Sequence, residues 1–121
     1  MKNNEQKAYW EQRIDRFDAI YDDNAGLREI TFLSRLVEPF RRQSLVQRSE
    51  LASTVLRKLG ISGRSFIDGG CGTGRMTQFL LEQGATRVLS IDITERAVEL
   101  ARKRIDTARK SSWGVVDFRV G

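Results

Sequence analysis

The sequence predicts an α/β fold in which a parallel β-α-β-α-β sheet is preceded by N-terminal helices. Two observations predict it. Apolar residues in the first half recur at helical spacing, whereas residues 61–121 alternate short apolar runs with helical segments. Of the ten glycines, only Gly26 and Gly60 precede residue 61. Strands that alternate with helices favour a parallel sheet with right-handed crossovers.

Residues 1–60 have the pattern of helices. One helical face is predicted from residues at spacings of 4, 3 and 4, namely Trp10, Ile14, Phe17 and Tyr21. The polar cluster 22–26 predicts a turn. A second helix is expected over 27–37, and Pro39 is expected to end or kink it. A third helix is expected from about residue 45 to Leu59, with Gly60 at its C-cap.

Residues 61–121 change to a strand-and-helix pattern. Short strands are expected at 65–68, 87–92 and 115–120. Two helices are expected between them, from 75 to 83 before Gly84 and from 95 to about 109 after the capping residue Thr94.

Composition excludes several classes of protein. A chain of 121 residues that is 40% apolar and 31% charged is typical of one small globular domain. No stretch approaches the ~20 apolar residues of a membrane span, and the N-terminus has no leader-like apolar region. One cysteine and no histidine exclude an internal disulfide, a zinc site and histidine-based catalysis by these residues. We therefore expect a cytoplasmic protein without a metal site.

The net charge of +5 raises the alternative of a nucleic-acid-binding domain. Charges of both signs are mixed along the chain, and the compact basic clusters are 41–42 and 102–104. This pattern favours an ordinary solvated surface over a polyanion-binding patch.

The most informative segment is a glycine-rich turn between a predicted strand and a predicted helix. Glycine lets a ligand approach the backbone closely, and a helix start offers unpaired N–H groups. The dinucleotide fingerprint G-x-G-x-x-G fails here, because Arg75 stands where its third glycine is required. A phosphate-binding P-loop is excluded because the chain has no Gly-Lys pair.

Residues 68–74 read Asp-Gly-Gly-Cys-Gly-Thr-Gly, which matches D-x-G-x-G-x-G in full. This segment resembles the first motif of class I S-adenosylmethionine-dependent methyltransferases. The resemblance continues at the next predicted strand, which ends in Asp92, 24 residues after Asp68. It implies a Rossmann-like methyltransferase fold with S-adenosyl-L-methionine as the cofactor.

The resemblance also implies roles for individual residues. The 70–74 backbone would lie beside the methionine moiety, Asp68 near its amino group through water, Asp92 at the ribose hydroxyls and Ile93 against the adenine. Cys71 is interpreted as a space-filling residue, and Arg75 as the cation best placed for the cofactor's carboxylate. The expected cofactor-binding residues are Asp68, Gly69, Gly70, Cys71, Gly72, Gly74, Asp92 and Ile93. No catalytic residue is nominated.

The resemblance is strongest over residues 64–110. Residues 1–60 are expected to form a helical segment, with a lid or cap and the helix before the first strand. Residues 61–121 are expected to form the cofactor-binding half-domain, which supplies three of the family's seven strands. We therefore expect an N-terminal piece of a longer methyltransferase, whose open sheet edge favours self-association.

The favoured function is methyl transfer to an O, N, S or C nucleophile of a small molecule. Alternatives from other classes are a non-catalytic cofactor-binding module and a basic nucleic-acid-binding domain.

Overall fold

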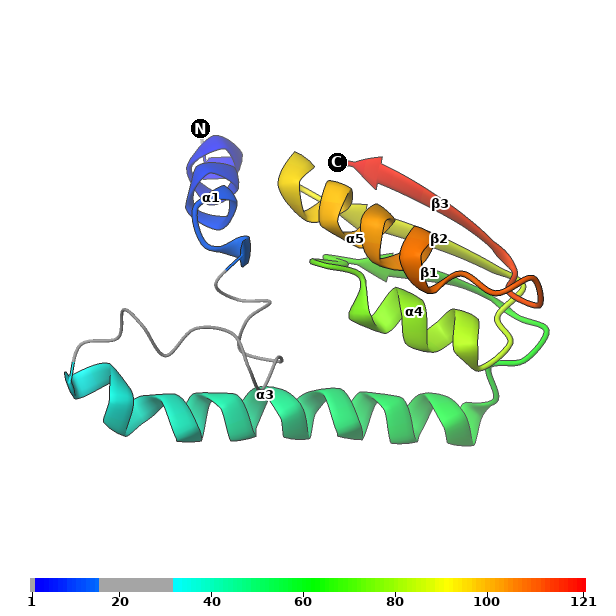
Figure 1. The fold of residues 1–121 in the computed structure, drawn as a ribbon, viewed down its shortest axis with the longest axis horizontal. Helices are drawn as coiled ribbons and strands as arrows, with labels where there is room; N and C mark the ends of the chain where they lie inside the picture. Colours follow the sequence, from blue (N-terminus) through cyan, green and yellow to red (C-terminus); the bar gives the residue numbers. More distant parts are fainter. Residues whose placement is uncertain (1, 16–31) are drawn as a thin grey trace. The chain divides into compact units, whose positions relative to one another are not determined.

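The computed structural model describes residues 2–15 and 32–121 (Figure 1). The elements in chain order are α1 (Lys2–Glu11), α3 (Phe32–Leu59), β1 (Ser65–Gly69), α4 (Arg75–Glu82), β2 (Arg87–Asp92), α5 (Glu95–Ala108) and β3 (Val115–Val120). The chain divides into two compact units. One contains 1–14 and 60–121, and the other contains 15–59.

Helix α1 differs from the predicted amphipathic helix. It begins at Lys2 and ends at Glu11, before Ile14, so the prediction that Trp10 and Ile14 share one continuous helical face is wrong. The Arg13 N–H donates to the Trp10 carbonyl at 2.9 Å, a three-residue turn that tightens the chain and interrupts the helical phase. The other predicted members of that face, and the predicted turn at 22–26, lie outside the described residues.

Helix α3 is a single helix of 28 residues that runs through Pro39, so the prediction of two separate helices with an end at Pro39 is wrong. The alternative, a kink at Pro39, stays a prediction. Proline removes one backbone donor inside a helix, at a cost of about 3 kcal/mol. The segments on both sides of it are rich in Leu, Arg, Glu and Gln, which favour helix and continue the hydrogen-bonding pattern. The helix ends at Leu59, and Gly60 follows with a φ of 84°.

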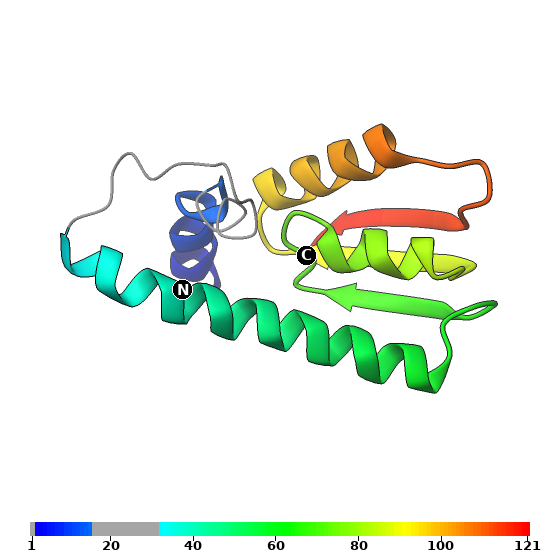
Figure 2. The same ribbon diagram turned by 60° about the horizontal axis from the view of Figure 1, so that its bottom comes forward.

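The three strands form one parallel sheet in the order β1-β2-β3, as the sequence predicts. Phe66 pairs with Val88, and Val88 pairs in turn with Val116. Helix α4 contacts β1 and β2, and α5 contacts β2 and β3. Both helices therefore cover the same face of the sheet (Figures 1 and 2).

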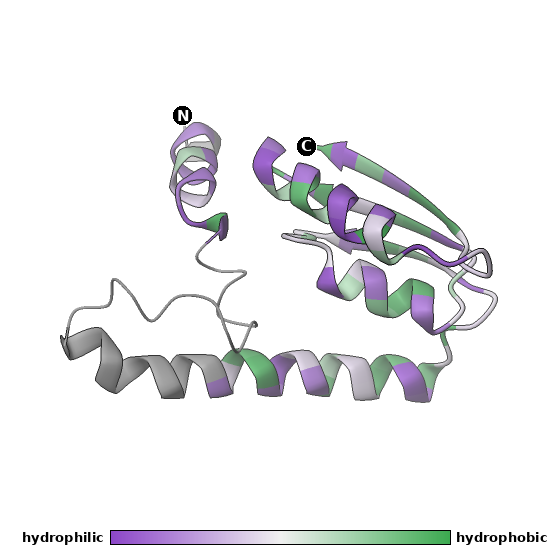
Figure 3. Cartoon of the chain, in the orientation of Figure 1, coloured by the Kyte–Doolittle hydropathy of each residue, from purple (hydrophilic) through white to green (hydrophobic). Residues whose placement is uncertain are grey.

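The core lies between these two helices and the sheet. Hydrophobic and hydrophilic residues alternate along α4 and α5 (Figure 3). Thr94 caps α5, as predicted, because its side chain accepts a hydrogen bond from the Ala97 N–H at 3.2 Å. The buried apolar side chains of this core include Leu80, Leu81, Val88, Ala97, Val98, Ala101 and Ile105.

The opposite face of the sheet is partly apolar and exposed. Ile67 is 72% exposed and Val115 is 56% exposed. Between them, Arg87 forms an ion pair with Asp117 at 2.9 Å. Among the described strands, β1 has one neighbour and forms an edge of the sheet. No described helix is both long enough and apolar enough to cross a membrane.

Candidate functional site

The glycine-rich loop, residues 70–74, turns over the carboxyl ends of β1 and β2. The N–H groups of Gly70 and Cys71 both donate to the Ile91 carbonyl, at 2.8 and 2.9 Å. The Gly74 N–H then donates to the Cys71 carbonyl at 3.0 Å and closes the turn before α4. These backbone hydrogen bonds fix the start of the loop to the end of β2. This edge of an open parallel sheet is where ligands bind.

Three glycines of the loop have positive φ angles, 73° at Gly70, 53° at Gly72 and 85° at Gly74. A Cβ atom added at Gly70 or Gly72 would meet nothing within 4 Å, so the space beside this backbone is open. A Cβ atom at Gly74 would lie 2.9 Å from the Ala101 Cβ. The first two glycines thus leave room for a ligand, and Gly74 allows the start of α4 to pack closely on α5.

The Asp92 carboxylate lies at the end of β2 and accepts a hydrogen bond from the loop. Its Oδ2 accepts the Gly72 N–H at 2.9 Å. Its Oδ1 accepts the N–H of Thr94 at 3.0 Å and the hydroxyl of Thr94 at 3.1 Å. A carboxylate has about four acceptor positions. One position on Oδ2 therefore remains for a ligand hydroxyl.

The Asp68 carboxylate is half-buried at the end of β1 and has a polar partner on α4. The Thr77 hydroxyl donates to its Oδ2 at 2.6 Å. Burial raises the pKa of the Asp68 carboxyl above its ordinary value, and the nearby charge of Asp92 raises it further. The hydrogen bonds from the side chain and backbone of Thr77 lower it. Two carboxylates in this arrangement favour a ligand that carries positive charge.

Cys71 lies inside the loop and is 7% exposed. Its Sγ–H points to the Gly72 carbonyl at 3.7 Å. Burial, with the charges of Asp68 and Asp92, raises the pKa of the thiol to about 12. Because the thiolate is the reactive form of cysteine, this environment fits a space-filling residue and not a nucleophile.

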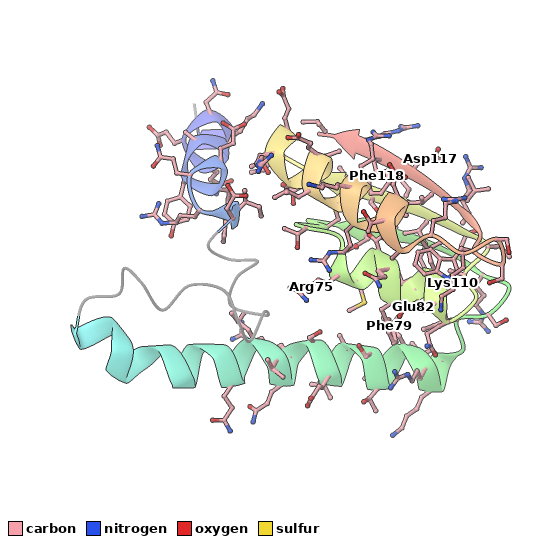
Figure 4. The ribbon with its side chains drawn as sticks, viewed as in Figure 1. Arg75, Phe79, Glu82, Lys110, Asp117 and Phe118 are labelled. Carbon is pink, nitrogen blue, oxygen red and sulfur yellow. The ribbon has the colours of Figure 1, made fainter. Side chains whose placement is uncertain are left out.

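Two further candidate residues, Ile93 and Arg75, flank the motif, whereas the acidic residue Asp117 of β3 lies away from it. Ile93 follows Asp92 and is 38% exposed, which leaves an apolar surface beside the carboxylate. Arg75 is the first residue of α4 (Figure 4). Asp117 lies on β3 and forms its ion pair with Arg87, the first residue of β2, so it faces the amino-terminal end of that strand and not the loop.

Residues 66–120 match the sequence profile described as a methyltransferase domain. The match contains the loop, both acidic residues and all but the first residue of the sheet. This segment, a little under half of the chain, is similar to methyltransferase domains.

Two curated methyltransferases are similar to part of this segment or its surroundings. Ribosomal protein L11 methyltransferase from Thermotoga maritima is 38% identical over 50 residues, which are 41% of this chain and 19% of that protein. The enzyme of the same name from Tolumonas auensis is 39% identical over 62 residues, which are 51% of this chain and 20% of that protein.

The likeness in fold extends further than the likeness in sequence. Magnesium protoporphyrin IX methyltransferase from Synechocystis, crystallised with S-adenosylmethionine, superposes with a TM-score of 0.76 at 22% identity. The superposition covers 100% of this chain and 54% of the Synechocystis chain. The chain thus spans about a fifth of the length of the curated relatives it matches and about half of that solved structure.

The described residues fit S-adenosylmethionine. Gly70 and Gly72 leave open space beside the loop, and the Asp92 carboxylate retains acceptor capacity next to the exposed side chain of Ile93. The cofactor carries an ammonium and a sulfonium. Their positive charge complements Asp68 and Asp92.

Three residues around this candidate site were not found by sequence reasoning. Thr77 and Ser90 form a buried hydroxyl pair behind Asp68, and Arg104 donates from its Nε to the Thr73 carbonyl at 2.8 Å. A sequence signal exists for the hydroxyl pair, because each residue is polar at a core-facing position of an otherwise apolar segment. No comparable signal marks Arg104, which is one of several cations on α5.

Proposed function

We propose that the chain binds S-adenosylmethionine between its glycine-rich loop and Asp92, and that the protein to which it belongs transfers the cofactor's methyl group to a small molecule. The observation that carries this proposal is the hydrogen bond from the Gly72 N–H to the Asp92 Oδ2 at 2.9 Å. It joins the two parts of the motif that are 20 residues apart in the sequence. They therefore form one binding surface at the carboxyl edge of the sheet.

Each part of the cofactor is assigned to a group that suits its chemistry. The 70–74 backbone takes the methionine moiety, and Asp68 takes its ammonium through water. The Asp92 carboxylate accepts a hydrogen bond from a ribose hydroxyl at its remaining Oδ2 position. Ile93 packs against the adenine, and Arg75 is proposed as the cation for the methionine carboxylate.

The chemistry of the proposed reaction comes mainly from the cofactor. When bound, the sulfonium supplies a methyl group that is already strongly electrophilic. The residues of this chain bind and orient it, so that an O, N, S or C nucleophile attacks opposite the sulfur. No residue of this chain is assigned as a general base.

A small-molecule acceptor is favoured by the extent of the structural likeness. A methyltransferase named for magnesium protoporphyrin IX matches the fold across the whole chain, including the N-terminal helices. The L11 methyltransferases are alike over 50 and 62 residues only.

The N-terminal residues are proposed as a lid or cap. Helix α1 contacts α5, and the Lys7 Nζ lies 3.6 Å from the Glu95 Oε1. Glu95 is the first residue of α5 and comes three residues after Asp92. Because Glu95 is close to Asp92 in the chain, this contact supports the proposed lid or cap role of α1. We retain 61–121 as the proposed cofactor-binding half-domain.

Calorimetric titration with S-adenosylhomocysteine tests the binding proposal. We expect micromolar binding by the chain and a loss of at least about tenfold in Asp92→Ala, because hydrogen bonds to a charged group are removed. Asp106→Ala is the matched control, since it removes an exposed carboxylate from α5 and leaves the loop untouched.

NAD and a short DNA duplex serve as ligand controls in the same titration. Binding of NAD or duplex in place of S-adenosylhomocysteine would contradict the proposal. Steep salt dependence of duplex binding would instead support the nucleic-acid alternative. A thermal melt of each variant shows whether lost binding reflects lost folding.

A further inference from the structure

We propose that Thr77 and Ser90 are positioning residues for the cofactor, which hold the Asp68 carboxylate ionised and correctly oriented through a chain of two buried hydroxyls. The inference rests on the proposed function, because it gives these hydroxyls a role through Asp68 and not through direct contact with the ligand.

The geometry defines a short polar chain across three elements. The Thr77 hydroxyl of α4 donates to the Asp68 Oδ2 of β1 at 2.6 Å. The same hydroxyl lies 2.7 Å from the Ser90 Oγ of β2. Thr77 and Ser90 are each 0% exposed, so both hydroxyls depend on protein partners and not on solvent.

An ionised Asp68 fixes the direction of both hydrogen bonds. A carboxylate can only accept, so the single hydroxyl proton of Thr77 is committed to Asp68. The oxygen of Thr77 must then accept the proton of Ser90 in the 2.7 Å contact. Each bond polarises the next, so two dipoles point at the carboxylate and offset part of the cost of its burial.

Packing alone does not require these hydroxyls. The buried residues of α4 are Thr77, Leu80 and Leu81, and the neighbouring core position on β2 is Val88. Valine has nearly the shape of threonine and would fill the same volume without a polar atom. A hydroxyl pair at a helix–sheet contact is therefore informative, because the charged group that it contacts is a residue of the proposed site.

The charged and titratable groups that face Asp68 are Asp92 at the end of β2 and the Cys71 thiol in the loop. Arg75 begins α4 two residues before Thr77. Burial and Asp92 raise the pKa of Asp68, whereas Thr77 lowers it. Removing the Thr77 hydroxyl should therefore raise this pKa further. Binding of the cofactor's ammonium should then be lost at a higher pH as the solution is acidified.

The test compares the unmodified chain with Thr77→Val, which removes the hydroxyl, and Thr77→Ser, which retains it. Val98→Ala is the control for a disturbed core, since Val98 is buried on α5 and belongs to the apolar core of that helix. Two quantities are measured. NMR titration of the Asp68 carboxyl carbon gives its pKa without ligand, and calorimetry gives S-adenosylhomocysteine affinity from about pH 7 down to about pH 5.

We expect Thr77→Val to raise the Asp68 pKa and to weaken binding roughly tenfold at neutral pH, with the acidic loss of binding moved to higher pH. Thr77→Ser should restore binding to within about twofold. Val98→Ala should leave the Asp68 pKa and the shape of the pH profile unchanged, even if the chain melts at a lower temperature.

The outcomes separate this inference from the proposed function. If the unmodified chain binds and Thr77→Val changes neither the Asp68 pKa nor the pH profile, the inference is overturned and the binding proposal stands. If the unmodified, folded chain does not bind, both are overturned for this chain. A Thr77→Val effect that Val98→Ala reproduces would show a structural role only, which also overturns the inference.

Discussion

At the scale of single residues, the site is defined by how few side chains approach the loop. Gly70 and Gly72 leave the space beside the backbone open, and Cys71 between them turns its sulfur toward the Gly72 carbonyl. Asp92 reaches this loop from the neighbouring strand. The Asp92 carboxylate and this open backbone are the proposed contact surface for the hydroxyl groups of a ligand.

The raised pKa of Cys71 predicts an unreactive thiol. With a pKa of about 12 in place of the ordinary 9.0, the thiolate population at pH 8 is lower by a factor of about a thousand. We expect thiol-specific labelling at this pH to be slow in the folded chain and fast in denaturant. Labelling of the native chain at the rate of the denatured chain would contradict this prediction.

The same pKa has a consequence for stability. The thiol is protonated in both states below pH 9.0, and above that value the unfolded chain loses its proton first. Stability therefore falls with rising pH between the ordinary pKa and the folded pKa of about 12. The fall should be shallower in Cys71→Ala than in the unmodified chain.

At the scale of elements, α5 holds the loop of α4 in place. Ala101 fills the space that a side chain at position 74 would need, at 2.9 Å from the added Cβ. Three residues further along α5, the Arg104 Nε donates to the Thr73 carbonyl at 2.8 Å. Thr94 at the start of this helix also donates to Asp92. One helix thus organises both parts of the proposed cofactor site.

Replacing Arg104 by methionine should weaken cofactor binding without unfolding the chain. Methionine retains the apolar stem and removes the donor to Thr73, a loss of about 1 kcal/mol or roughly fivefold in S-adenosylhomocysteine affinity. The matched control is Arg102→Met on the same helix. The Arg102 guanidinium lies 5.1 Å from the ring centre of Phe118 on β3, which is labelled in Figure 4.

Calorimetry on both variants measures the effect. Equal affinities for Arg104→Met and Arg102→Met would show that charge on α5, and not the contact to the loop, sets the affinity.

At the scale of the whole molecule, the sheet has two unlike faces. Helices α4 and α5 cover one of them, and the other exposes Ile67 and Val115 beside the Arg87–Asp117 ion pair. Strand β1 is also an edge strand among the described strands. An exposed apolar position on an edge strand favours pairing with another chain.

We therefore predict that the chain self-associates through β1. Sedimentation velocity over a range of concentrations should show association of the unmodified chain and a monomer for Ile67→Lys, which adds charge at a position that is 72% exposed. The control is Leu59→Lys on α3, which is 64% exposed. Dissociation by the Leu59 variant alone would place the contact on α3 instead.

The sequence by itself determined the β-α-β-α-β half of the molecule. Strands β2 and β3 have the predicted bounds, and β1, α4 and α5 differ from prediction by one residue at one end. Local signals suffice there, because glycines and the Thr94 cap mark the ends of elements and apolar runs mark the buried strands. In the N-terminal half such signals mislead, since Pro39 lies inside a continuous helix.

Tertiary structure alone decided how the site is held together. The motif identifies Asp68 and Asp92, but their partners come from residues that are distant in the sequence. Thr77 lies 9 residues from Asp68, and Arg104 lies 31 residues from Thr73. Such contacts depend on which faces of α4 and α5 meet the sheet. A periodic pattern predicts which face of a helix is buried, but it does not predict how deeply a side chain is buried or which residue it contacts. The residues of the loop and its acidic partners can therefore be identified from the sequence, whereas their positions are set only when the helices pack on the sheet.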